Sequence, residues 1–318
     1  MPLNVTIIGM DALGQSIGLA LKASTAAINV TAHDREITAA GEAKKRGAAD
    51  NVEWNLLNAV EKADLVFLNE PIHQMRETME HIAPVLRRDT VVTDTASVKS
   101  SVLQWAETIF PAHAHFVGGT PLVTAVAPDG LLFQNHRYAI IPLPRTDEAA
   151  VRLVTETVTL LGAQPLFIEP SEHESLMAAV RHLPALMGAA LLQLTTQSQS
   201  WKEMSAMTDP AYNVATLLPT SDPTELAALM RHNRAAIVHW LGALRQELTS
   251  LQMLLENDDE GAALASRIAS LIEAQSRWQR AEQHNPDVPT HAEAWEKAEE
   301  MRGLSRWFGF GFGKRRGE

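Results

Sequence analysis

The first residues whose spacing could do chemistry are the glycines near the start of the chain. The segment Gly9–Gly14 reads GMDALG and follows the apolar run Val5–Ile8, so it has the frame of a G-x-G-x-x-G turn whose middle glycine is replaced by aspartate. Glycines in such a turn let the backbone approach a pyrophosphate, which the N–H groups of the following helix then bind. We therefore expect Gly9, Leu13 and Gly14 to contact a dinucleotide.

Two acidic residues affect the expected cofactor in opposite ways. Asp34 lies twenty residues after Gly14, at the end of the next predicted strand, where a carboxylate accepts hydrogen bonds from the ribose hydroxyls of NAD. Its position favours NAD over NADP. Asp11 instead brings a carboxylate to about 4 Å from a phosphate charge, which costs about 1 to 4 kcal/mol. We expect NAD binding to be weakened if Asp11 faces the pyrophosphate.

A third acidic residue follows the apolar run Leu65–Leu68. Glu70 and Pro71 belong to a loop that we expect near the nicotinamide ribose, where Glu70 adds a second negative charge to the predicted dinucleotide cleft. His73 begins the next helix, and its ring either lines this cleft or is solvated at the helix N-terminus.

Four further segments carry polar residues at a characteristic spacing: DTASVK at 94–99, FVGGTP at 116–121, EHE at 172–174 and HLP at 182–184. In order and spacing they resemble the D-x-x-S-x-K, F-x-G-G-H-P, E-H-D and S-H-L-P-H segments of the prephenate/arogenate dehydrogenase family. With Asp222, Pro223 and the helix around Asn233, the resemblance spans about residues 3–281. It implies NAD(P)-dependent oxidation of prephenate or arogenate with loss of carbon dioxide, on the route to tyrosine, by a two-fold homodimer.

The resemblance also implies roles for individual residues. Ser97 matches a serine that orients the substrate and the proton-accepting histidine, and His182 matches a histidine that lines the pocket. Thr120 stands where that proton-accepting histidine is expected, and losing a general base slows a reaction by about 10² to 10⁴. The segment 212–217 (YNVATL), which includes Asn213, lacks both arginines of the family's F-R-D-x-T-R, one of which holds a substrate carboxylate. Arg181 stands where the family has serine and could supply a guanidinium.

Three of these residues have a plainer structural interpretation. Arg181 could lie on a helix flank in water, because arginine is mostly exposed. His182 could be a hydrogen-bonded core histidine instead of a pocket residue. Ser97 could be the N-cap of the following helix, since serine is a preferred cap.

The elements that must position these residues follow from hydrophobic patterning. Apolar runs at 5–8, 29–32, 65–68, 90–94, 115–118, 138–142 and 165–168 read as strands separated in the first half by helical stretches. This alternation predicts an α/β fold with an N-terminal Rossmann-type parallel sheet, helices on both faces. After Pro170 the pattern is helical throughout. We expect a dinucleotide-binding domain at 1–169, an all-helical substrate and dimerisation domain at 170–282, and a linker, short helix and basic aromatic tail at 283–318.

Composition narrows the function class. With 27 basic and 38 acidic residues the net charge is −11, which disfavours nucleic acid and anionic membranes as main partners.

No cysteine is present, which excludes disulfides and thiol chemistry. No metal site is expected, because His113 and His115 lack a suitably spaced third ligand. No secretory signal or spanning helix is recognised, so we expect a cytoplasmic protein. The tail is either a frayed terminus or a docking segment.

Two hypotheses remain open at this stage. The chain is either a working oxidoreductase with altered substrate or reduced activity, or a non-catalytic relative whose dimeric scaffold serves binding or regulation. In both cases the expected partners are a small-molecule substrate or ligand and a second copy of the chain.

Overall fold

The computed structural model describes residues 2–143, 145–219, 222–257 and 261–283. The predicted tail beyond residue 283 lies outside this range.

The first half is built on one sheet of eight strands, in the order β3-β2-β1-β4-β5-β6-β7-β8. All neighbouring strands are parallel except β6 and β7, which are antiparallel. The predicted parallel sheet is therefore confirmed apart from this one reversal. The strands are β1 (Leu3–Ile8), β2 (Ile28–His33), β3 (Asn51–Val52), β4 (Leu65–Leu68), β5 (Val91–Asp94), β6 (His115–Pro121), β7 (Arg137–Pro142) and β8 (Gln164–Phe167).

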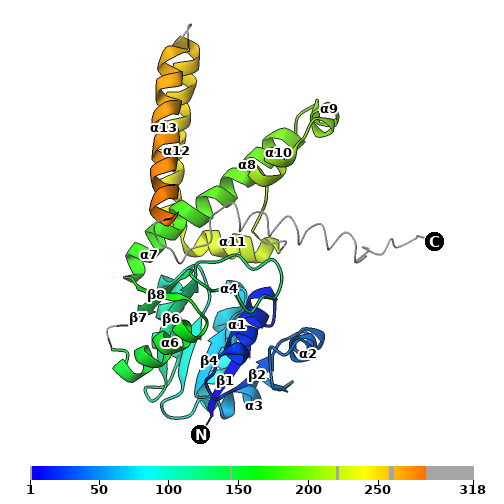
Figure 1. Cartoon of the computed structure of the whole chain (residues 1–318), viewed down its shortest axis with the longest axis vertical. Helices are drawn as coiled ribbons and strands as arrows, with labels where there is room; N and C mark the ends of the chain where they lie inside the picture. Colours follow the sequence, from blue (N-terminus) through cyan, green and yellow to red (C-terminus); the bar gives the residue numbers. More distant parts are fainter. Residues whose placement is uncertain (1, 144, 220–221, 258–260, 284–318) are drawn as a thin grey trace, which may run out of the picture.

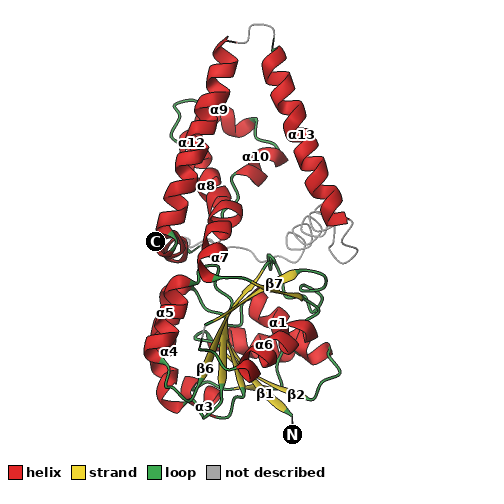
Figure 2. Cartoon of the chain, turned by 90° about the vertical axis from the view of Figure 1, so that its left-hand side faces the viewer, coloured by secondary structure: helices red, strands yellow, loops and turns green. Residues whose placement is uncertain are grey.

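Helices cover both faces of this sheet, as Figure 2 shows. One face packs on α1, α2 and α6, and the other on α3, α4 and α5, which gives two apolar cores separated by the sheet. Strands buried on both faces read as continuous apolar runs, which is why β4 is so apolar. The helices are α1 (Ala12–Ala23), α2 (Ile37–Lys45), α3 (Leu56–Glu61), α4 (Ile72–Ile82) with a 3₁₀ turn at Ala83–Val85, α5 (Ser100–Ile109) and α6 (Glu148–Leu160).

From Pro170 onward the described chain is helical, as predicted, and forms a long arm that rises from the carboxyl edge of the sheet (Figure 1). The arm consists of α7 (Pro170–Met177), a π-helical turn (Ala178–His182), α8 (Leu183–Thr196), α9 (Trp201–Ala206), α10 (Pro210–Ala215), α11 (Pro223–His232), α12 (Arg234–Asn257) and α13 (Ala262–Gln283).

One helical run in this arm bears on the expectation that no spanning helix is present. Residues Pro170–Thr196 are long and apolar enough to cross a membrane, judged by length and composition alone. The core helix of a soluble protein passes the same test, although such a helix is mostly buried and only 28% of the apolar window is buried here; His173 and His182 are two of the buried residues of this run.

Candidate functional site

A cavity of about 270 Å³ lies where the carboxyl edge of the sheet meets the helical arm. This edge, at the point where strand order reverses on either side of β1, is where open α/β sheets bind ligands. Residues from the glycine turn, the β4 and β5 loops, the loop after β6 and the arm line it; among them are Asp11, Leu13, Asn69, Glu70, Pro71, Thr95, Ser97, Thr124, Arg181, His182, Glu225 and Met230. The structure thus brings together most of the predicted site residues.

The turn between β1 and α1 requires its two glycines. Gly9 has a φ of +93°, and a Cβ there would lie 1.9 Å from the carbonyl oxygen of Asn69. A Cβ on Gly14 would lie 2.0 Å from the carbonyl oxygen of Gly9. Both positions therefore exclude any side chain, as the turn frame predicted.

Asp11 occupies the helix end that the turn should offer to a phosphate. It is the N-cap of α1, and its Oδ1 accepts hydrogen bonds from the backbone N–H groups of Leu13 (3.0 Å) and Gly14 (2.9 Å). The same oxygen accepts one from the side-chain amide of Asn69 at 2.7 Å. An internal carboxylate thus sits on the N–H groups that a pyrophosphate would use.

The Asp34 carboxylate points toward the turn, and its ribose-binding role stays a prediction. Its Oδ2 accepts from the backbone N–H of Met10 at 2.6 Å, and its Oδ1 from that of Glu36 at 2.7 Å. The neighbouring Arg35 extends across the end of β1 to Glu70, at 3.2 Å, and also contacts Glu77. Arg35 gave no signal in the sequence, because its partners come from a distant strand end.

Glu70 is more buried than an acidic loop residue usually is. Its side chain is 6% exposed, and only Oε1 is paired, with Arg35. No described residue hydrogen-bonds to its buried Oε2. A buried carboxylate oxygen without a hydrogen-bond partner destabilises the folded state. Among the described residues, Arg35 alone is paired with the negative charge of Glu70.

The described residues therefore fit only part of a dinucleotide. The glycine turn has the backbone shape of the fingerprint, and Asp34 lies at its mouth, where an acid would bind the ribose. Asp11 does not fit, because a pyrophosphate would have to displace its carboxylate from Leu13 and Gly14.

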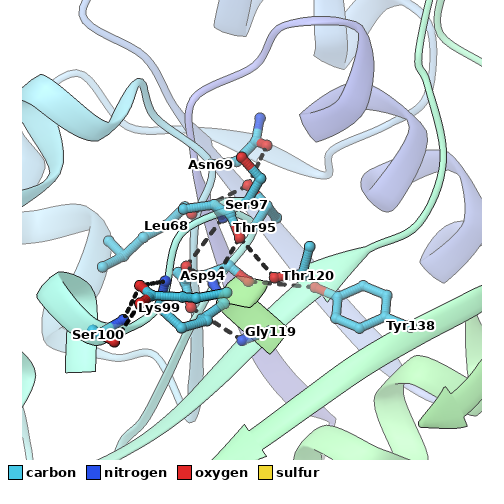
Figure 3. Close-up of polar contacts among 12 residues, drawn as sticks. Leu68, Asn69, Asp94, Thr95, Ser97, Lys99, Ser100, Gly119, Thr120 and Tyr138 are labelled. Atoms are coloured by element: carbon cyan, nitrogen blue, oxygen red, sulfur yellow. Dashed lines mark hydrogen bonds and ion pairs between the residues drawn. The ribbon is translucent and has the colours of Figure 1, made fainter. Parts of the chain in front are cut away.

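A buried ion pair holds the loop that carries Ser97 (Figure 3). Lys99 and Asp94 are fully buried and paired, and Lys99 Nζ also donates to the Ala96 carbonyl at 2.7 Å. Asp94 accepts from the backbone N–H groups of Ala96 and Gly119, both at 3.0 Å. Burial lowers the pKa of Lys99 and raises that of Asp94, and their mutual attraction opposes both shifts. The conformation of this loop is thereby fixed.

Ser97 faces the helical arm and does not cap a helix. α5 begins at Ser100, and the capping alternative for Ser97 is wrong because its hydroxyl instead lies 3.1 Å from His182 Nε2. His182 is buried yet lines the cavity, so both interpretations of this histidine hold at once. Burial, together with nearby Arg181, lowers the pKa of His182 to about 4. Its ring is therefore neutral at neutral pH.

Thr120 lies beneath the loop and not in the cavity. Its side chain is buried, and its hydroxyl donates to the Ala96 carbonyl at 2.7 Å. Thr120 is not among the cavity-lining residues, so its predicted catalytic role rests on the resemblance alone.

The remaining predicted residues fall in three places. Arg181 lines the cavity while it is also solvent-exposed, which combines its two interpretations. Asn213 is exposed on α10, away from the cavity lining, and its substrate role stays a prediction. His73 lies 3.9 Å from Asp222 of the arm, and no group of metal-binding residues occurs within the described ranges.

Comparison with known proteins identifies the family of this chain. Residues 17–166 match the model of the prephenate dehydrogenase nucleotide-binding domain, and residues 169–269 match that of its dimerization domain. Cyclohexadienyl dehydrogenase of Zymomonas mobilis is 25% identical over 262 residues, covering 80% of this chain and 89% of that protein. Prephenate dehydrogenase of Bacillus subtilis is 23% identical over 263 residues, covering 80% and 71%.

Solved structures show the same fold. Prephenate dehydrogenase from A. aeolicus, in complex with hydroxyphenyl propionate and NAD+, superposes with a TM-score of 0.79 at 21% identity over 87% of this chain and 98% of that one. Arogenate dehydrogenase from Synechocystis gives 0.71 at 22% identity over 87% and 100%. The sheet, the arm, the glycine turn and both matched domains lead to one conclusion: this chain belongs to the prephenate dehydrogenase family.

Proposed function

We propose that this chain is an NAD-linked oxidoreductase of the prephenate/arogenate type whose oxidation of those two substrates is strongly reduced. One observation carries the proposal: no imidazole in the described cavity is placed to accept a proton. Thr120 replaces the expected histidine and is turned away beneath Ala96. His182 is neutral, but both of its ring nitrogens are engaged, with Ser97 and Asn233.

The predicted pocket still offers groups for a carboxylate substrate. Arg181, Ser97 and His182 come from two parts of the chain and meet at one cavity wall. Arginine binds carboxylates through paired N–H groups, so Arg181 supports a prephenate-like acid as ligand. Of the cofactors, NAD is favoured over NADP because Asp34 faces the turn, and Asp11 is expected to weaken its binding.

The test is NADH formation from prephenate and from arogenate, followed by absorbance, beside the B. subtilis relative under the same conditions. We expect turnover at least a hundredfold below the relative, because a lost general base costs about 10² to 10⁴ in rate. Thr120→His should recover about tenfold or more, whereas Thr120→Val, which only removes the hydroxyl, should not. Turnover equal to the relative's would disprove the reduced activity.

A non-catalytic relative is the second candidate, and the capping contact of Asp11 favours it. If calorimetry shows no NADH binding at millimolar concentration, the oxidoreductase proposal fails and the binding or regulatory role gains support.

A homodimer forms part of both candidates. The second matched domain is a dimerization domain, and the α12–α13 hairpin exposes large apolar side chains to solvent: Leu241, Leu248, Met253, Leu255, Ile268, Leu271 and Ile272. Light scattering is expected to give twice the 34.8 kDa chain mass. A monomer at micromolar concentration would contradict this. A cytoplasmic location stays a prediction of the sequence.

A further inference from the structure

The side chain of Asn233 lies behind His182, on the side away from Ser97. Asn233 ends α11, is buried, and places Nδ2 3.3 Å from His182 Nδ1. The same Nδ2 donates to the backbone carbonyl of Glu174 at 2.8 Å. His182 itself ends a π-helical turn, a distortion that often occurs at functional sites.

The Glu174 carbonyl determines the orientation of the Asn233 side-chain amide. A carbonyl oxygen can only accept, so the amide atom beside it must be the nitrogen and not the oxygen. That nitrogen also faces His182 and offers its second hydrogen there. His182 Nδ1 must therefore accept, because an Nδ1–H would place two donors against each other at 3.3 Å.

The single proton of the neutral ring is then on Nε2. Nε2–H points at Ser97 Oγ, 3.1 Å away, and donates to it. No described residue accepts the hydrogen of the Ser97 hydroxyl, and Ser97 lines the cavity. The hydroxyl is thus free to donate to a ligand.

We infer that Asn233 is a positioning residue that holds His182 in its Nε2–H tautomer and so makes Ser97 a hydrogen-bond donor to a carboxylate or carbonyl oxygen in the cavity. Arg181 lines the same cavity and offers further donors, beside the carboxylate of Glu225. The ligand class rests on the proposed function, whereas the tautomer does not. His182 cannot substitute for the missing base in this arrangement.

Nitrogen-15 NMR of histidine-labelled full-length protein measures the tautomer directly, with His182→Gln to assign the signals. In the wild type we expect the His182 proton on Nε2 at pH 7. Asn233→Asp replaces the donor with a carboxylate, so the proton should move to Nδ1 or the ring should become doubly protonated. Asn58→Asp, at an exposed position on α3, is the matched control and should change nothing at His182.

Wild-type His182 with its proton on Nδ1 would overturn the inference, as would an unchanged tautomer in folded Asn233→Asp. If that variant does not fold, the wild-type spectrum alone decides. Prephenate binding, measured by calorimetry, tests the consequence: Ser97→Ala and Asn233→Asp should each weaken it about tenfold. Wild-type protein that binds no prephenate would count against the proposed substrate class while the NMR result still decides the role of Asn233.

Discussion

At the N-terminus of α1, the Asp11 side chain accepts the backbone hydrogen bonds that a bound phosphate would accept. The Asp11 carboxylate satisfies the N–H groups of Leu13 and Gly14, and a negative charge at a helix N-terminus is favourable. A ligand phosphate must displace this carboxylate or approach it closely. The altered residue therefore stabilises the helix while it competes with the cofactor.

Asp11→Gly is expected to raise NAD affinity about tenfold, measured by calorimetry. The change frees two N–H groups and removes a charge whose repulsion of a phosphate is worth about 1 kcal/mol when it is solvent-screened, as for this exposed side chain. Asp147→Gly is the matched control, because it removes an exposed N-cap of α6 remote from the cavity and should leave affinity unchanged. Asp11→Asn, which keeps the cap but not the charge, should give a smaller gain. Equal affinity in wild type and Asp11→Gly would show that Asp11 does not oppose the cofactor.

At the scale of elements, α5 receives its cap from the other half of the chain. Its own N-cap residue, Lys99, provides no side-chain cap. Glu174 of α7 supplies the missing acceptors: Oε1 accepts from the backbone N–H groups of Lys99 (3.2 Å) and Ser100 (2.8 Å), and Oε2 from the Ser100 hydroxyl (2.7 Å). This carboxylate joins the arm to the sheet half beside the Ser97 loop.

Glu174→Ala is expected to lower the free energy of unfolding by about 1 to 2 kcal/mol, the usual range for a lost cap at a helix N-terminus. Urea unfolding measures it. Glu172→Ala, two residues away and exposed, serves as the control and should cost less than about 0.5 kcal/mol. If both variants lose the same free energy of unfolding, Glu174 does not stabilise the protein by capping α5.

Some elements could not be predicted from local sequence. β3 has two residues and too few apolar positions to be recognised. β7 runs antiparallel to β6 because no helix lies between them, so the usual crossover to a parallel strand is absent. The helix that we expected to begin at His73 ends at Ile82 and continues as a 3₁₀ turn, because Pro84 cannot supply a helix N–H.

At the scale of the whole molecule, two buried histidines make the stability depend on pH. His173 is buried within electrostatic reach of Lys99 and His182, and no described residue hydrogen-bonds to either of its ring nitrogens. Burial lowers its pKa to about 3, with Lys99 and His182 adding to the effect, while burial and Arg181 lower the pKa of His182 to about 4. Both rings stay neutral in the folded protein well below the usual histidine pKa.

The free energy of unfolding is therefore expected to fall as pH drops from 7 to 5. In that window the unfolded chain binds protons that the folded chain does not, because the unfolded pKa is about 6.5. Each histidine should lower the free energy of unfolding by about 1 to 2 kcal/mol over this window. Urea unfolding at several pH values measures the change. The double variant His173→Leu and His182→Gln should have a flatter profile, and a profile as steep as the wild type's would contradict the assignment.

The sequence by itself determined the Rossmann-type sheet and the helical second half, and it singled out a minority of the cavity-lining residues, among them Asp11, Ser97 and His182. This was possible because strand and helix periodicity, the glycine turn and the spacing of Asp34 are local signals. Only the tertiary structure decided what those residues do to one another. Asp11 on its own helix end, Thr120 beneath Ala96, and Asn233 behind His182 depend on contacts between residues far apart in the chain or on the direction a side chain takes, and spacing along the sequence specifies neither.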